Sequence, residues 1–310
     1  MGVDHAGVDR EAAAVSRGVR VLAPAKINWT IEVLRIRPDG YHEIRSVLQT
    51  IDLCDVVTLT EADDVTLSVT GEAGLLAGEP VESNLAYRAA VAFRRRTGVR
   101  RGVRIELEKH VPVAAGLGGG SSDAAAVLRG LNQLWDAGQP LDNLIEIAGE
   151  IGSDPPFFVI GGTAMASGRG DHVEALPDAV APPIVLATPP AEQRGDKTAS
   201  MYGALTPDDF GEGYVSIGVR EIVEAGRAIV DAELANVFER VTAAQQPATA
   251  IAMDALRAQG HTPHLAGSGP SFFLLEPASD ELLARIRDLG FEPRAIGTLP
   301  RDAALRVEEL

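Results

Sequence analysis

Residues 112–126 read PVAAGLGGGSSDAAA, with four glycines in five positions, then a serine pair and a run of alanines. Just before this stretch, Val103, Ile105 and Leu107 alternate with charged residues, as in a half-buried strand. After it, apolar residues recur at helical spacing as far as Leu134, and Gly138 and Pro140 supply a stop. The pattern predicts a strand, a glycine turn and a helix in succession.

The glycine turn has the composition of a phosphate-binding loop. Glycines lack a Cβ atom, so the backbone can approach a ligand closely, while Ser121 and Ser122 can cap the helix or bind an anion. The free N–H groups and the positive end of the helix dipole favour a phosphate at this point. An ordinary flexible turn between strand and helix is the alternative interpretation.

Two common phosphate motifs do not match. The P-loop needs a lysine after its last glycine, whereas Ser121, Ser122 and Asp123 follow here, and Ser121 also stands where the dinucleotide fingerprint needs its third glycine. Residues 209–211 match the DFG triplet of protein kinases, but no HRD or VAIK sequence accompanies them. The loop is therefore of another type.

This loop resembles the second motif of the GHMP small-molecule kinases. Two further motifs agree with that superfamily in order, PAKIN at residues 24–28 and AGSGPS at residues 266–271. The sequences DGYH at 39–42 and GSDPPFF at 152–158 resemble the members that phosphorylate a CDP-linked polyol in the non-mevalonate isoprenoid pathway. The resemblance spans most of the chain. It implies an α+β fold of two domains, with the active site in the cleft between them.

The resemblance implies an enzyme, a kinase that uses ATP and Mg²⁺ to phosphorylate the 2-hydroxyl of a CDP-linked methylerythritol. Lys26 and Asp154 would be the catalytic residues, Lys26 offsetting charge on the phosphoryl group and Asp154 accepting the hydroxyl proton. By residue type alone, Lys26 is a solvated strand lysine, and Asp154 before Pro155 is a helix N-cap. The cap and the base are compatible, because a helix start and Lys26 both favour the ionised carboxylate.

The same resemblance assigns the binding residues. ATP would be held by Pro112, Gly116, Leu117, Gly118, Gly119, Gly120, Ser121, Ser122, Asn84 and Lys109, with Ser122 as the candidate Mg²⁺ ligand. The substrate would be bound by Asn28, Tyr41, His42, Tyr202, Gly267, Ser268 and Gly269, with cytosine stacked on Tyr41 and bonded by His42. The residue types alone indicate a helix cap at Asn84, a strand aromatic at Tyr41, a surface histidine at His42 and an ordinary turn at 267–269.

The rest of the chain predicts the organisation of the fold. A disordered tail is expected at 1–18, an ATP-binding domain at 19–177 and a second domain at 178–310, because prolines cluster from Pro177 onward. Strands are expected at 19–33, 44–51, 55–60, 65–69, 103–107, 184–187 and 272–275, and helices from residue 85 and at 124–134, 141–151, 222–241 and 243–259. On the first strand the odd positions are apolar, which places Lys26 and Asn28 together on the other face.

Composition limits the possible partners. The formal net charge of -16 argues against nucleic-acid binding, and no run of 18 apolar residues indicates a membrane span. The single cysteine, Cys54, fits a reducing cytoplasm. We expect ATP and a small-molecule substrate as ligands, and a monomer or weak homodimer.

Two other functions remain open at this point. A homoserine or mevalonate kinase would keep the glycine loop but would have no use for Tyr41 and His42. A non-catalytic ATP-binding regulator on the same fold would be expected to lose Lys26 or Asp154, and both are present. In the second domain, residues 236–239 read NVFE where GHMP relatives carry an Asn-Asp-Leu-Glu type sequence.

Overall fold

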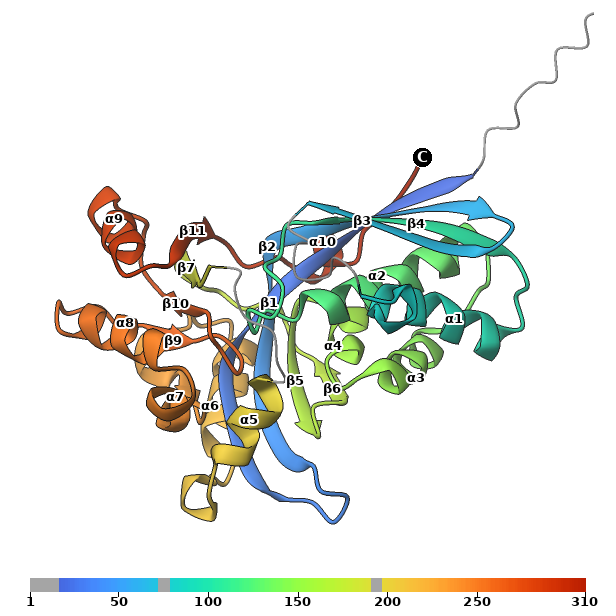
Figure 1. The fold of residues 1–310 in the computed structure, drawn as a ribbon. Coiled ribbons are helices and arrows are strands. Elements are labelled where there is room, and N and C mark those ends of the chain that lie inside the picture. The colour runs from blue at the N-terminus through green and yellow to red at the C-terminus, as the bar shows by residue number, and fades with distance from the viewer. Residues whose placement is uncertain (1–16, 72–78, 191–196) are drawn as a thin grey trace, which may run out of the picture.

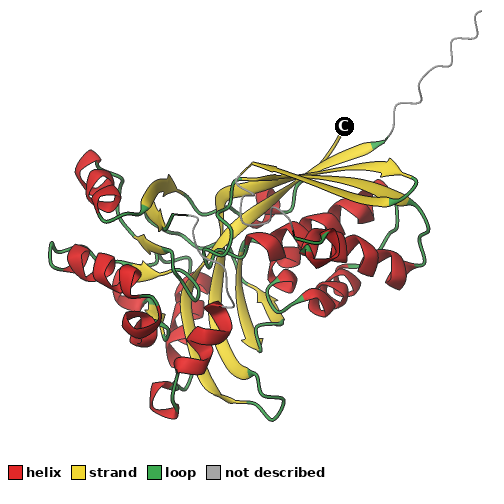
Figure 2. Ribbon diagram, viewed as in Figure 1, coloured by secondary structure: helices red, strands yellow, loops and turns green. Residues whose placement is uncertain are grey.

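The computed structural model describes residues 17–71, 79–190 and 197–310 (Figure 1). These residues form both helices and sheets whose strands are mostly antiparallel, so the α+β expectation is confirmed (Figure 2). Residues 1–16, most of the predicted tail, lie outside the described residues, and Gly18 already belongs to the first strand.

Two long antiparallel strands form the centre of the molecule. They are β1 (Gly18–Ile36) and β2 (His42–Ala62), joined by a turn in which Gly40 N–H donates to the Arg37 carbonyl. The prediction of two separate strands at 44–51 and 55–60 was wrong, because β2 runs on through residues 52–54, where Cys54 pairs with Pro24 and the register then shifts before Thr50 pairs with Lys26. The register shifts between Pro24 and Lys26 and again between Asn28 and Thr30, and such bulges bend a strand and re-aim its side chains.

The larger sheet has the order β12-β1-β2-β4-β3, with β5 on β2, β6 on β5 and β8 on β1. Its other strands are β3 (Val65–Gly71), β4 (Gly102–Lys109), β5 (Thr163–Gly168), β6 (His172–Ala175), β8 (Ala235–Asn236) and β12 (Val307–Glu309). Helices α1 (Leu85–Thr97), α2 (Gly119–Leu134), α3 (Leu141–Ile151) and α4 (Pro155–Ile160) gather beside one face of it (Figure 1). The short α10 (Arg301–Ala304) precedes β12.

A smaller sheet, of order β11-β7-β10-β9, lies on the other side of the β1–β2 pair. Its strands are β7 (Ile184–Thr188), β9 (His264–Leu265), β10 (Phe272–Leu274) and β11 (Glu292–Ile296). Helices α5 (Lys197–Ala204), α6 (Tyr214–Glu224), α7 (Glu239–Gln245), α8 (Pro247–Arg257) and α9 (Asp280–Asp288) belong to this side.

Two helix predictions on this side need correction. The helix expected at 222–241 is not formed, because α6 ends at Glu224 and the chain then enters β8, which pairs with β1. The helix expected at 243–259 is divided into α7 and α8 at Gln246, just before Pro247, whose missing N–H suits the first position of a new helix.

Strand β1 contributes to the core from Val19 to Val33. Its odd positions enter three buried clusters in turn, Val19 to Ala23 against α1–α4, Ala25 to Trp29 in the middle, and Ile31 and Val33 against the smaller sheet. Its even positions 26 to 32 are buried as well, so the strand has two covered faces at its centre rather than one. The boundary predicted at residue 177 remains a prediction.

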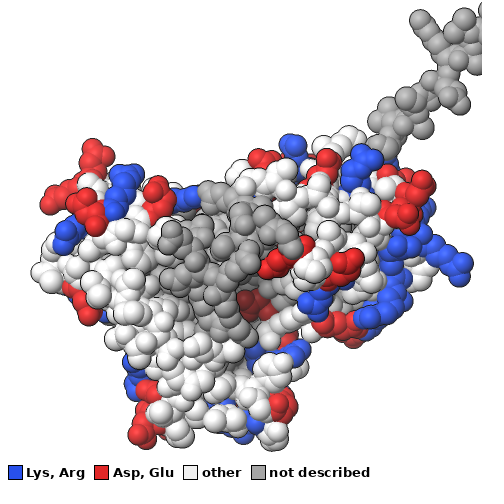
Figure 3. Space-filling view, viewed as in Figure 1, with Lys and Arg blue, Asp and Glu red and all other residues white. Residues whose placement is uncertain are grey.

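Charged residues of both signs share the surface. On the face shown in Figure 3, basic side chains gather at the end of the molecule where Figure 1 places α1, with acidic ones among them. Arg95 and Arg96 of this helix form ion pairs with Glu150 and Glu146 of α3. In the described part of the chain, no helix is both long and apolar enough to span a membrane.

A matched pair of glycines tests how tightly α2 packs on the central strands. A Cβ atom on Gly130 would lie 2.5 Å from Leu59 Cδ1 and 3.0 Å from Val21 Cγ2, whereas one on Gly149 of α3 would meet nothing within 4 Å. Gly149→Ala should raise the free energy of unfolding by about 1 kcal/mol through helix propensity. Gly130→Ala should lower it, because overpacking costs about 1–3 kcal/mol. Urea titrations of both variants measure the difference, and equal stabilisation would contradict this packing.

Candidate active site

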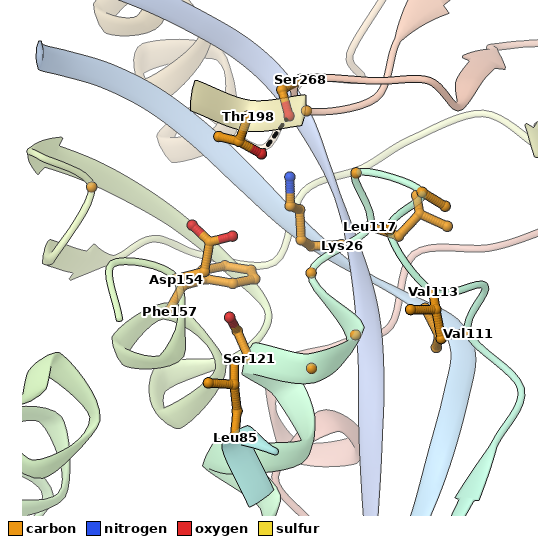
Figure 4. Close-up of a pocket in the computed structure, with 18 of the residues that line it drawn as sticks. Lys26, Leu85, Val111, Val113, Leu117, Ser121, Asp154, Phe157, Thr198 and Ser268 are labelled. Carbon is orange, nitrogen blue, oxygen red and sulfur yellow. Dashed lines mark hydrogen bonds between the residues drawn. The ribbon is translucent and has the colours of Figure 1, made fainter. Parts of the chain in front are cut away.

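A cavity of about 420 Å³ opens between the glycine turn, α4 and the turn that precedes β10 (Figure 4). Its size is within the range of small-molecule pockets. Of the residues predicted for the site, the lining includes Lys26, Asn28, Asn84, Lys109, Pro112, Gly116, Leu117, Gly118, Gly119, Gly120, Ser121, Asp154, Tyr202, Gly267 and Ser268. It does not include Tyr41, His42, Ser122 or Gly269. Segments more than 200 residues apart in the sequence thus meet at one cavity.

The glycine turn ends where α2 begins. Gly118 is the N-cap residue with φ 74°, a left-handed conformation that favours glycine, and Ser122 N–H makes the first helical bond, to the Gly118 carbonyl. The N–H groups of residues 119–121 therefore have no acceptor within the helix. Ser121 and Ser122 were expected as caps, but the helix starts at Gly119, two residues earlier than Ser121, and no side chain caps it. The unpaired N–H groups and the helix dipole together provide an anion site.

Lys26 lies beside this helix start. Its backbone N–H donates to the Leu117 carbonyl at 2.9 Å, which ties β1 to the glycine turn. Its side chain is only 6% exposed, and its Nζ donates to Asn28 Oδ1 at 2.8 Å, so the two residues share one face of β1 as predicted. Burial lowers the pKa of Lys26, and the charge of Asp154 opposes that shift. Because its only acceptor among the described residues is the neutral Asn28 amide, the buried Lys26 ammonium can also bind an anion.

Asp154 stands at the first turn of α4, before Pro155. It occupies the N-cap position, but its backbone is helical and its side chain accepts no capping bond, so the N-cap interpretation holds for position only. Figure 4 shows its carboxylate and the Lys26 ammonium pointing into the same part of the cavity, below the Thr198–Ser268 pair. Because it is not used as a cap, the carboxylate is available for chemistry.

A second glycine turn closes the cavity from the side of the smaller sheet. A Cβ on Gly267 would lie 2.5 Å from Lys26 Nζ and 2.6 Å from the Gly116 oxygen, and one on Gly116 would lie 2.5 Å from the Gly269 oxygen. Side chains are therefore excluded where the two turns meet. Thr198 Oγ1 and Ser268 Oγ, 3.1 Å apart, link this turn to α5.

Asn236, at the start of the divergent NVFE sequence, holds the second turn in place. Its Nδ2 donates to the carbonyls of Leu265 and Gly267, both at 2.8 Å, and its Oδ1 accepts from Phe238 N–H. The sequence analysis assigned no role to Asn236. The only hint was that NVFE and the Asn-Asp-Leu-Glu type sequence of GHMP relatives both begin with asparagine.

Asn84 caps α1 as the residue type predicts, since its Oδ1 accepts from Ala86 N–H at 2.9 Å. It also lines the cavity, as the resemblance implied. The cap and the cavity position are therefore compatible.

Lys109 lies in a buried cluster that the sequence analysis missed. Its Nζ donates to Asp55 and, at 2.7 Å, to Asp123, while Asp55 Oδ1 also accepts from the N–H groups of His110 and Val111. Burial raises the pKa of Asp123 to about 8, against the pull of Lys109. Burial also opposes the charge on Lys109, but the two carboxylates outweigh it and raise the pKa of that ammonium. The cluster fixes the chain where it enters the glycine turn.

The three residues expected around cytosine are placed differently from one another. Tyr202 lines the cavity, and its ring stacks on the imidazole of His42, with centroids 5.0 Å apart. Burial lowers the pKa of His42, which favours a neutral ring with one donor and one acceptor nitrogen. Tyr41 is 54% exposed on the β1–β2 turn, and the Arg169 guanidinium lies 5.5 Å from its ring centre. The structure brings His42 and Tyr202 together and leaves Tyr41 outside the lining.

Comparison with known proteins agrees with this geometry. The family model for the GHMP kinases N terminal domain matches residues 84–162, from the start of α1 to the start of β5. The 4-diphosphocytidyl-2-C-methyl-D-erythritol kinase of Dehalococcoides mccartyi is 40% identical over 82% of this chain and 88% of its own length. The protein of the same name from Bacillus licheniformis is 42% identical over 81% of this chain and 86% of its own.

Solved structures give the same result. The crystal structure of a 4-(cytidine 5'-diphospho)-2C-methyl-D-erythritol kinase, 32% identical, superposes with a TM-score of 0.71 over 90% of this chain and 99% of its own. The homoserine kinase from Cytophaga hutchinsonii superposes equally well, with a TM-score of 0.71 over 96% of this chain and 98% of its own, but at 16% identity it supports the fold alone. The chain therefore belongs to the 4-diphosphocytidyl-2-C-methyl-D-erythritol kinase family of GHMP kinases.

Proposed function

We propose that this chain is a kinase that transfers the γ-phosphoryl group of ATP to the 2-hydroxyl of 4-diphosphocytidyl-2-C-methyl-D-erythritol, in the non-mevalonate isoprenoid pathway. The observation that carries the chemistry is that one cavity holds an uncapped helix start, a buried ammonium at Lys26 and an unengaged carboxylate at Asp154. Relatives at about 40% identity carry the name of that activity. The absence of an internal disulfide partner for Cys54 fits a cytoplasmic reaction.

Each group in the cavity has a distinct task in this mechanism. The acceptor hydroxyl gives its proton to the Asp154 carboxylate as its oxygen bonds to the γ-phosphorus of ATP. The bond from that phosphorus to the β–γ bridging oxygen breaks, and ADP leaves with the electron pair. Lys26 offsets the negative charge on the transferring group, and the N–H groups at the start of α2 hold the phosphates.

Mg²⁺ would enter this site mainly with ATP. In the part of the chain that the structure describes, no three acidic, histidine or cysteine residues are grouped as a metal site. Ser122, the candidate ligand, is fully buried with an unpartnered Oγ and does not line the cavity, whereas the Ser121 hydroxyl does. Mg²⁺ commonly keeps several waters and substrate phosphates as ligands, so a single protein hydroxyl is sufficient. The ion would neutralise phosphate charge.

Cytosine would be recognised at Tyr202 and His42, which form one stacked pair at the edge of the cavity. A neutral imidazole can both donate to and accept from the polar edge of a base. Tyr41 would have to turn inward from the β1–β2 turn to add a second stack. Asn28 would orient the polyol, and Gly267, Ser268 and Gly269 would face the diphosphate.

The choice of acceptor tests this function directly. The conjugate carrying CDP should be phosphorylated efficiently, whereas methylerythritol alone, homoserine and mevalonate should be very poor substrates. A base held by stacking gains roughly 1–3 kcal/mol, and polar groups left unpaired without it add to the loss. Coupled ADP-release assays across the four acceptors give the answer. Equal rates with and without the CDP group would refute the cytidine pocket.

The base is tested by Asp154→Asn. Positioned proton transfer contributes about 10²- to 10⁴-fold, so kcat should fall by that factor while ATP affinity changes little. Asp142→Asn, an exposed first-turn carboxylate on α3 outside the cavity, is the matched control and should leave kcat unchanged. Near-native turnover of Asp154→Asn would remove it as the base.

The phosphate site is tested at Gly120, which is exposed and lines the cavity. A Cβ there would make only an ordinary contact of 3.6 Å with Leu85 Cδ1, so Gly120→Val should keep the fold and the thermal midpoint. If phosphate lies on the helix start, the added methyl groups should weaken ATP binding by more than about tenfold. Isothermal calorimetry with ATP measures this, and an unchanged affinity would move the phosphates elsewhere.

A further inference from the structure

The catalytic lysine is held by a chain of buried hydrogen bonds that the proposed mechanism has not used. Lys26 Nζ donates to Asn28 Oδ1 at 2.8 Å, Asn28 Nδ2 donates to Ser46 Oγ at 2.8 Å, and Ser46 Oγ donates to the Thr30 carbonyl at 2.6 Å. Ser46 is on β2 and only 1% exposed. It also lines the cavity, but its hydroxyl is engaged by Asn28 and by the Thr30 carbonyl.

The direction of every bond in this chain is fixed by chemistry. A carbonyl can only accept, so the one hydrogen of the Ser46 hydroxyl is committed to Thr30. The hydroxyl oxygen can then only accept from Asn28, which requires the NH₂ group of the amide to face Ser46. The amide oxygen is thereby turned toward Lys26, whose ammonium can only donate. No other arrangement of these hydrogens satisfies all three bonds.

The far end of the chain is anchored rather than open to solvent. Thr30 Oγ1 donates to Ser216 Oγ at 2.8 Å, and Ser216 Oγ donates to Glu32 Oε2 at 2.7 Å. Glu32, 9% exposed, also accepts from Ser216 N–H at the first turn of α6. Positions 26, 28, 30 and 32 of β1 are therefore one polar strip, fastened to β2 and to α6.

We infer that Ser46 is a positioning residue of the kinase: it holds the Asn28 amide so that its oxygen fixes the Lys26 ammonium against the transferring phosphoryl group. This inference rests on the proposed function of Lys26. Ser46 touches neither ATP nor the acceptor in this role, and acts through Asn28. Without its hydroxyl, Asn28 Nδ2 is a buried donor with no acceptor, and the amide turns away from Lys26 to find one.

The charges around Lys26 determine how its pKa would respond to loss of the Ser46 hydroxyl. Asp154, at the N-cap of α4, is the charge that acts on Lys26. The glycine turn contributes only neutral groups, and the ammonium of Lys109 is bound by Asp55 and Asp123. Burial already disfavours the ammonium, and the Asn28 oxygen stabilises it. Removing a hydrogen bond to a charged group should lower the pKa of Lys26 by about one unit. The ammonium would then be lost at lower pH, and kcat/KM would fall earlier on the alkaline side.

The chain contains three lysines, Lys26, Lys109 and Lys197, which makes this pKa directly measurable. Protein labelled with ¹³C at the lysine ε-carbons gives three resonances, assigned with Lys109→Arg and Lys197→Arg. Their titration reports the Lys26 midpoint without any substrate. Steady-state kinetics with the CDP conjugate are measured in parallel. An inactive wild-type protein would refute the proposed function, whereas the Lys26 titration would still test the role of Ser46.

Four variants complete the test. In Ser46→Ala the Lys26 midpoint should fall by about one unit and kcat by about tenfold or more, with the KM for ATP within about twofold of wild type. Ser46→Thr restores the hydroxyl and should restore both. Thr188→Val removes another buried strand hydroxyl that donates to a backbone carbonyl, outside the cavity, and should change neither. If Ser46→Ala does not fold, Ser46→Cys replaces it, because a thiol is a weak donor and acceptor of similar size.

Two results would overturn the inference. One is a Lys26 midpoint and kcat in the Ala or Cys variant equal to those of wild type, which would make Ser46 a space-filling residue. The other is an equal fall in thermal midpoint and kcat in the Ser46 variant and in Thr188→Val, with the titration midpoint of Lys26 unchanged in both. That result would show a general loss of stability instead of a positioning role.

Discussion

The structure depends on a contact in which two glycine turns meet backbone to backbone beside Lys26. The oxygen of Gly116 lies 2.6 Å from where a Cβ on Gly267 would stand, and the oxygen of Gly269 lies 2.5 Å from where one on Gly116 would stand. All three glycines have positive φ, so both the space and the conformation exclude other residues. One turn leads into α2 and the other into β10. In the proposed mechanism, this contact would determine where the phosphate site faces the acceptor.

Holding the contact in place requires polar groups in the interior. Asn236 binds the second turn through its carbonyls, and Asp55 binds the N–H groups that lead into the first. Each of these side chains is costly to bury alone and acceptable when its hydrogen bonds are complete. The contact between the turns therefore rests on hydrogen-bonded polar side chains as well as on apolar packing.

Local pattern predicted much of this fold. The strand, glycine turn and helix at 103–134, the α3 helix and the shared face of Lys26 and Asn28 follow from periodicity and turn chemistry, and the structure confirms them. Periodicity failed where tertiary pairing decides, as at β8, where Ala235 and Asn236 leave a helical pattern to pair with β1. The helix start was misjudged because Gly118 caps α2 by conformation rather than by a side chain. Ser46, Asp55 and Asp123 were missed because their partners are distant in sequence, and no local spacing signals such a bond.

The charges that line the cavity favour the proposal that backbone groups have the leading part in holding phosphate. Among the described residues that line it, two lysines, Lys26 and Lys109, face three acids, Glu79, Asp123 and Asp154. Lys109 is already engaged by two carboxylates, which leaves Lys26 as the lining ammonium without an ion pair in the described chain. A site with so little free positive charge cannot neutralise two phosphorylated ligands through its side chains. Under the proposed function, neutral N–H donors at the start of α2 would bind phosphate without adding a permanent charge, and a divalent ion carried by ATP would supply what the protein lacks. Lys26 would then be reserved for the charge that develops during transfer, where a fixed orientation would have the largest effect on rate.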